Sequence, residues 1–103
     1  MKIVRVQYTT KAEYAATNRN NIQAIIDELA GLKHEGINYS AFVEEDGKTF
    51  MHLDRFENEE AHLVLQELQS FKTFAAELWA SGLEIEPKLH LLTPAAATET
   101  TLK

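Results

Sequence analysis

The sequence predicts an α+β fold whose elements follow the order β-α-β-β-α-β. Two stretches carry apolar side chains at helical spacing, four show the alternation of strands, and an Asp-Gly pair separates two of those strands. The chain has 103 residues, 45% hydrophobic and 25% charged, which suffices for one domain with a packed core. We expect residues 1–94 to form that domain and residues 95–103 to form a flexible C-terminal tail.

The first strand and the first helix are predicted at the N-terminus. In residues 2–9, apolar and polar side chains alternate, which is typical of a strand with one covered face. Thr10-Lys11-Ala12-Glu13 has the spacing of a capping box, so a helix should begin there. The later part of this helix has an apolar stripe in steps of three and four residues: Ile22, Ile25, Ile26, Leu29 and Leu32.

A β-hairpin is predicted next. Alternating segments at residues 37–44 and 49–56 flank Glu45-Asp46-Gly47-Lys48. Asp-Gly favours a tight turn because glycine readily adopts a positive φ angle. The two strands should therefore pair antiparallel.

A second helix and a last strand complete the order. Asn58 is a capping residue, and the acidic residues after it favour the positive end of a helix dipole. The helix should end at Gly82, with Gln69-Ser70 as a point where it can break into two pieces. Pro87 introduces a short strand over residues 88–92, and Pro94 stops it.

This order is the split βαβ motif of ferredoxin-like folds. Right-handed crossovers place both helices on one face of a four-stranded antiparallel sheet, with the first and third strands in the middle. Side chains alternate across each strand, so the pattern also assigns residues to the two faces of the sheet.

The helix-covered face should take the more apolar set of strand residues: Val4, Val6, Tyr39, Ala41, Val43, Met51, Leu53, Leu89 and Leu91. The open face should then take a mixture of aromatic and ionisable residues: Arg5, Gln7, Ser40, Phe42, Phe50, His52, Asp54, Phe56, His90 and Leu92. Such a mixture is too apolar to face water and too polar for a plain core, so we expect it to meet a ligand or a second chain.

Composition excludes several function classes. The formal net charge is −6 and the Lys and Arg residues are scattered, which argues against nucleic-acid binding. The absence of cysteine excludes disulfides, thiolate catalysis and Cys-type metal sites. No apolar stretch has the length of a membrane span and the N-terminus does not resemble a signal peptide, so we expect a cytoplasmic protein without membrane contact.

The run from Gly47 to Ala61, followed by Ser70-Phe71-Lys72-Thr73-Phe74, resembles the antibiotic biosynthesis monooxygenase family of dimeric α/β-barrel proteins. The resemblance covers residues 1–93. It implies that two copies press their open sheet faces together into a barrel. It also implies that small aromatic or polyketide substrates, or haem in one branch, occupy pockets between sheet and helices.

The haem-degrading branch of that family uses an Asn on the first strand, a Trp at the end of the third and a His on the second helix. This chain has Gln7, Phe56 and Ala75 at those places. We therefore expect no cofactor.

The candidate catalytic residues are His52, Asp54 and Arg5. His52 and Asp54 stand two apart on one strand, and Arg5 is on the neighbouring strand. They predict either a general base oriented by a carboxylate, with Arg5 holding an anionic oxygen, or a salt-bridged polar cluster inside a dimer interface. The candidate ligand-binding residues around them are Gln7, Phe42, Phe50, Phe56 and His90.

Other residues are given less weight. His52, His90 and Asp54 are suitable metal-ligand types, but no closely spaced pair anchors such a site, so no metal is expected. Tyr8, Tyr39 and Phe42 either line a pocket for a planar ligand or pack in the ordinary way. His34 and His62 should face solvent.

Two functions follow from these observations. The first is a homodimer that binds a small aromatic or quinone-like ligand without catalysis. The alternative is a cofactor-independent monooxygenase or isomerase acting on a small aromatic or polyketide-like substrate, with His52 as base and Arg5 and Gln7 positioning the substrate.

Overall fold

The fold is ferredoxin-like, as the sequence predicts. A computed structural model describes residues 1–98, and the last part of the predicted tail, residues 99–103, lies outside this range. The elements are β1 (Lys2–Thr9), a short 3-10 helix η1 (Ala12–Tyr14), α1 (Ala15–Leu32), β2 (Ile37–Val43), β3 (Thr49–Phe56), α2 (Glu59–Glu67), α3 (Gln69–Ser81) and β4 (Ile85–Leu92). The strands form one antiparallel sheet in the order β2-β3-β1-β4.

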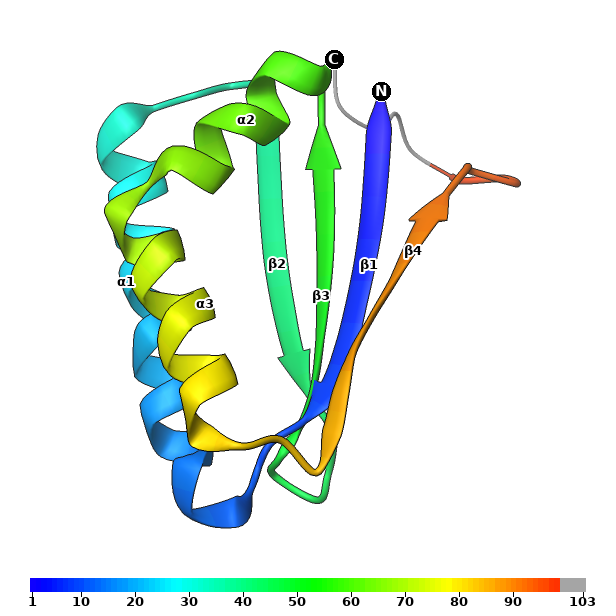
Figure 1. The fold of residues 1–103 in the computed structure, drawn as a ribbon. Coiled ribbons are helices and arrows are strands. Elements are labelled where there is room, and N and C mark those ends of the chain that lie inside the picture. Colours follow the sequence, from blue (N-terminus) through cyan, green and yellow to red (C-terminus); the bar gives the residue numbers. More distant parts are fainter. Residues whose placement is uncertain (99–103) are drawn as a thin grey trace.

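The helices lie together on one face of the sheet (Figure 1). In the middle of the sheet β1 and β3 are neighbours, which confirms the predicted strand order, and α1 packs against α3. The core between the two layers is built from side chains of both: Val4, Tyr8, Ile22, Ile25, Phe50, Phe56, Ala61, Leu65, Leu68, Phe74 and Leu78. No helix within residues 1–98 is long and apolar enough to cross a membrane, and the cytoplasmic location stays a prediction.

The predicted capping box at the first helix is wrong. Lys11 is the N-cap of η1 and its side chain forms no capping hydrogen bond. The Thr10 hydroxyl instead donates to the backbone oxygen of Lys48 in the β2–β3 connection, 3.4 Å away. Because Thr10 is fully buried beside that connection, its hydroxyl serves the sheet rather than the helix.

The predicted start of the last strand after Pro87 is wrong, because β4 begins at Ile85 and an edge strand with a register shift tolerates a proline. The other predicted helix and turn signals are confirmed. Asn58 caps α2, where its side-chain oxygen accepts a hydrogen bond from the Ala61 N–H at 2.9 Å. Gly47 in the hairpin and Gly82 after α3 have φ angles of 75° and 76°, a region that favours glycine. The second helix breaks at Leu68, whose backbone is extended between α2 and α3.

The predicted faces of β3 are wrong by one residue. Val4, Val6 and Tyr8 of β1 lie directly opposite Asp54, His52 and Phe50 of β3, so all six share the helix-covered face. Met51, Leu53 and Arg55 consequently belong to the open face.

Phe50 and Phe56 explain this outcome. The two rings are 2% and 0% exposed, and burying two aromatic side chains outweighs burying Met51 and Leu53. The turn fixes the register, because Asp46 Oδ1 accepts hydrogen bonds from the N–H groups of Lys48 and Thr49.

The apolar residues of β4 are less covered than predicted. Leu89 and Leu91 lie on the helix side, opposite Val6 and Val4, yet they are 59% and 67% exposed. The reason is that β4 is an edge strand that diverges from the helical layer (Figure 1). It therefore borders the space between the layers without closing it.

Candidate functional site

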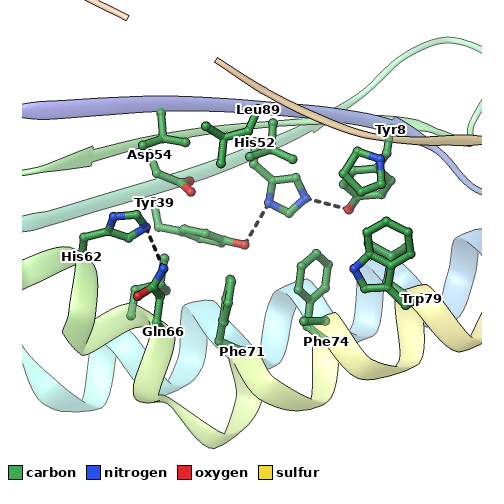
Figure 2. Close-up of a pocket in the computed structure, with 16 residues that line it drawn as sticks. Tyr8, Tyr39, His52, Asp54, His62, Gln66, Phe71, Phe74, Trp79 and Leu89 are labelled. Carbon is green, nitrogen blue, oxygen red and sulfur yellow. Dashed lines mark hydrogen bonds between the residues drawn. The ribbon is translucent and has the colours of Figure 1, made fainter. Parts of the chain in front are cut away.

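A cavity of about 290 Å³ lies between the sheet and helices α2 and α3. Figure 2 shows the strand side chains pointing down into it and the helix side chains pointing up. Its walls combine aromatic, aliphatic and a few ionisable groups: Val4, Val6, Tyr8, Tyr39, His52, Asp54, His62, Leu65, Gln66, Phe71, Phe74, Ala75, Leu78, Trp79, Pro87 and Leu89.

The break between α2 and α3 positions the helical wall. Glu28 of α1 accepts hydrogen bonds at Oε1 from the Ser70 N–H (3.1 Å) and the Ser70 hydroxyl (2.6 Å). These bonds satisfy donors in the first turn of α3 and fix its start against α1. Phe71, Phe74, Ala75 and Leu78 then recur at helical spacing along the cavity.

A buried hydrogen-bonded chain crosses the strand wall. Asn18 Nδ2 donates to Tyr8 Oη at 2.8 Å, Tyr8 Oη lies 2.7 Å from His52 Nε2, and Tyr39 Oη lies 2.8 Å from His52 Nδ1. Burial lowers the pKa of His52 to about 4, so the imidazole is neutral at pH 7 and carries one N–H. One tyrosine therefore donates to the ring and the other accepts from it.

The burial of Tyr8 decides which group donates in each of these hydrogen bonds. Tyr8 is 1% exposed and its oxygen already accepts from Asn18, so donation to His52 Nε2 satisfies the Tyr8 proton. His52 Nδ1–H then donates to Tyr39 Oη. This arrangement leaves the Tyr39 hydroxyl proton available to the cavity.

Asp54 is the unusual group of the site. Its side chain is 6% exposed, and its Oδ1 is fully buried without a hydrogen-bond partner within residues 1–98. Burial raises the pKa of Asp54 to about 8, which keeps the carboxyl group mostly protonated at pH 7. Figure 2 shows this group directed into the cavity between Tyr39 and His62.

His62 of α2 closes the site beside Asp54. Its ring stacks on Phe56 with a centroid distance of 4.4 Å, and its Nε2 lies 3.4 Å from Gln66 Nε2. Burial, with a further contribution from the Lys2 charge, lowers the pKa of His62. The expectation that His62 faces solvent is wrong, because Phe56 lies on the helix-covered face and the His62 ring stacks on it. His34 is exposed, as expected.

The predicted site residues are divided between the two faces of the sheet. His52, Asp54, Phe50 and Phe56 lie under the helices, whereas Arg5, Gln7, Phe42 and His90 lie on the open face. The predicted cluster of Arg5 with His52 and Asp54 is therefore wrong.

On the open face, Arg5 Nη2 lies 3.4 Å from His90 Nδ1 instead. His52, His90 and Asp54, considered above as metal-ligand types, do not come together, since His90 faces away from the other two. Of the aromatic residues considered for a pocket, Tyr8 and Tyr39 line the cavity and Phe42 does not.

Several site residues were not found from the sequence. Asn18 lies four residues before Ile22, so its spacing places it on the buried face of α1, but the sequence does not show that its side chain donates to Tyr8. Phe71 and Phe74 belong to an apolar helical stripe, which predicts core packing and does not distinguish a cavity from a filled core. Trp79 is 55% exposed at the edge of the cavity.

Solved structures share this fold over almost the whole chain. A protein from Bacteroides thetaiotaomicron, provisionally named an antibiotic biosynthesis monooxygenase, matches with a TM-score of 0.82 and 14% identity over 97% of this chain and 94% of that one. The resemblance to antibiotic biosynthesis monooxygenases is confirmed as a likeness of fold.

Two further structures show the same likeness. Another antibiotic biosynthesis monooxygenase matches with a TM-score of 0.75 and 14% identity, over 93% of this chain and 100% of its own. Rv0793 from Mycobacterium tuberculosis matches with a TM-score of 0.77 and 14% identity, over 95% of this chain and 98% of its own. No family model matches the sequence. No curated protein matches it either. Function must therefore be argued from the site itself.

Proposed function

We propose that this protein binds a small planar aromatic ligand in the cavity between the sheet and α2–α3. The observation that carries the proposal is the combination of an apolar cavity in the core with a buried carboxyl group, Asp54, that has no partner within the described residues. Protein cores are close-packed and buried polar groups are usually hydrogen-bonded, so a site that departs from both rules is suited to a ligand.

The size and walls of the cavity limit the ligand. An apolar cavity of about 150 Å³ accommodates benzene, and this cavity is about twice that volume, which suits one or two fused rings. Aromatic side chains from both layers offer stacking and edge contacts: Tyr8, Tyr39, Phe71, Phe74 and Trp79. Trp79 and Leu89 are more than half exposed, so the route from solvent lies beside β4.

A cofactor-independent monooxygenase or isomerase is the second candidate. The observation that favours it is the buried position of Asp54 in the cavity wall, unpartnered among the described residues, because with a pKa of about 8 its carboxylate form is a stronger base than an ordinary aspartate. It could take a proton from a phenol or from a carbon next to a carbonyl group. His52 is less suited, since both of its ring nitrogens are engaged by tyrosine hydroxyls.

Ligand binding can be tested with one pair of variants on α3. Ala75 lines the cavity and Ala76, the next residue, is exposed. We expect wild type to bind 1,4-naphthoquinone, measured by quenching of Trp79, the single tryptophan, and Ala75→Phe to weaken this binding at least about tenfold because the new ring occupies the site.

Ala76→Phe serves as the control and should bind like wild type, because its new side chain points away from the cavity. Equal binding by Ala75→Phe and Ala76→Phe would place the ligand elsewhere. If wild type bound neither 1,4-naphthoquinone nor two other bicyclic aromatic probes, naphthalene and naphthoate, the proposal would be removed.

We propose as well that two copies associate through the open sheet face. This face carries Phe42, which is 54% exposed, and Leu92, which is 37% exposed, beside the half-buried Met51 and Leu53. Exposed apolar residues of this kind, set among the polar side chains of one sheet face, favour association of a small domain. The resemblance to the monooxygenase family implies a barrel in which the open sheet faces of two copies meet. This arrangement agrees with the proposed dimer.

A matched pair of variants tests the proposed dimer. Phe42 on the open face and Leu63 on α2 are 54% and 52% exposed, so each substitution by Glu exchanges a similarly exposed apolar side chain for a charge. We expect light scattering at micromolar concentration to give twice the chain mass for wild type and Leu63→Glu, and a lower mass for Phe42→Glu. A single-chain mass for wild type would contradict the dimer.

A further inference from the structure

We propose that the pocket selects an uncharged aromatic ketone or quinone whose carbonyl oxygen accepts a hydrogen bond from the Asp54 carboxyl group. This inference rests on the ligand pocket proposed above and names the class of ligand. Two features carry it: the position of Asp54 in the wall and the lack of a Lys or Arg among the described residues that line the cavity.

The position of Asp54 leaves the cavity as the place for its partner. Its neighbours across the sheet are Val4 on β1 and Tyr39 on β2. Val4 has no polar side-chain atom, and the Tyr39 hydroxyl, which accepts from His52, makes no hydrogen bond to Asp54 Oδ1. The Asp54 Oδ1 atom is buried without a partner, so a ligand oxygen in the cavity would satisfy a group that the described residues leave unsatisfied.

The charges around Asp54 disfavour an anionic ligand. Four titratable groups share the cavity with it: Tyr8 on β1, Tyr39 on β2, His52 on β3 and His62 on α2. The lining residues of α3 and β4 are all uncharged, and no Lys or Arg among residues 1–98 lines this cavity. A carboxylate or phenolate ligand would therefore be buried without a counter-charge.

The protonation states favour donation by the protein. Burial raises the pKa of Tyr8 and of Tyr39 above the usual value of 10, and it lowers the pKa of His52 to about 4 and that of His62 from 6.5. With the pKa of Asp54 raised to about 8, all five groups are largely neutral near pH 7. The acid then has an O–H to donate, and the Tyr39 hydroxyl proton is a second donor in the same wall. A neutral aspartic acid beside a tyrosine hydroxyl is a known way to polarise a carbonyl group.

Three bicyclic probes separate the alternatives: naphthalene, 1,4-naphthoquinone and naphthoate share one ring skeleton and differ in the oxygen they present. The chain has no cysteine, so the quinone cannot form a thiol adduct. At pH 6 we expect wild type to bind naphthoquinone about tenfold more tightly than naphthalene, as one additional hydrogen bond predicts, and naphthoate more weakly than naphthalene.

The preference should depend on the acid proton. At pH 9 wild type should lose most of its preference for naphthoquinone, because an ionised carboxylate cannot donate. Asp54→Asn keeps an N–H donor and should retain the preference at both pH values. Asp54→Leu should bind naphthalene and naphthoquinone equally, and its binding of naphthalene shows that the pocket is intact.

Equal affinity of wild type for naphthoquinone and naphthalene at pH 6 would overturn the inference while leaving the aromatic pocket in place. Tightest binding of naphthoate would overturn it too. Failure of all three probes to bind would instead remove the proposed pocket function on which the inference depends.

Discussion

His52→Ala is expected to lower the free energy of unfolding by about 3 to 5 kcal/mol, a large part of the roughly 5 to 15 kcal/mol that stabilises a typical domain. His52 is 3% exposed and joins the hydroxyl groups of Tyr8 and Tyr39. The substitution leaves the Tyr8 proton without its acceptor and enlarges the cavity, and both effects are destabilising. Urea denaturation near pH 7 measures the change.

His90→Ala is the matched control. His90 is exposed on β4, and its side-chain contact is with Arg5 at 3.4 Å. Its loss should change the free energy of unfolding by about 0.5 kcal/mol or less. A His52→Ala variant as stable as His90→Ala would show that the Tyr8–His52–Tyr39 chain does not hold the strand wall together.

Asp54→Asn is expected to change how stability depends on pH. The folded protein holds the Asp54 proton up to about pH 8, whereas the unfolded chain releases it near the ordinary aspartate pKa of 3.8. Between these values the folded state binds more protons, so the free energy of unfolding falls as the pH rises. Above about pH 8 both states are ionised and the loss is complete.

His52 acts in the opposite direction at lower pH. Its pKa is about 4 when folded and 6.5 when unfolded, so its contribution to stability is lost as the pH falls from 6.5 to 4. Of these two groups, only Asp54 changes between pH 6.5 and 8. Each pH unit is worth about 1.4 kcal/mol, which predicts a loss of about 2 kcal/mol in wild type over this window.

The comparison of Asp54→Asn with wild type isolates this effect. The variant keeps the shape and polarity of the side chain and lacks its titration, so the difference in unfolding free energy should shift in its favour by about 2 kcal/mol from pH 6.5 to pH 8. Other titrating groups are common to both proteins and cancel. Stability curves that stay parallel through this range would mean that the Asp54 proton is lost at an ordinary pH.

The sequence predicted the fold well because its signals are local. The Asp46-Gly47 turn, the Asn58 cap and the break before Gln69 each act within a few residues, and each is present. Their order along the chain then leaves few topologies. Thr10 is the exception, since its hydroxyl bonds to a residue far away in the sequence.

The sequence predicted two residues of the candidate site, but it did not predict which side chains lie around them. The sequence predicts His52 and Asp54 as the candidate catalytic residues of β3, and their predicted placement on the open face is wrong. Strand periodicity gives two alternating sets without saying which is inside, and exchanging the sets moves every side chain of the strand to the other face. The exchange separated Asp54 from Arg5 and brought it near His62, whose contact with Phe56 depends on the fold.

A crystal structure of the protein with 1,4-naphthoquinone tests the central claim most directly. We predict that the quinone lies between the sheet and α3, with one carbonyl oxygen at a hydrogen-bonding distance of about 2.5 to 3.0 Å from an Asp54 carboxyl oxygen. A quinone bound on the open face beside Arg5 and His90, or a cavity that stays empty at saturating quinone, would contradict the account.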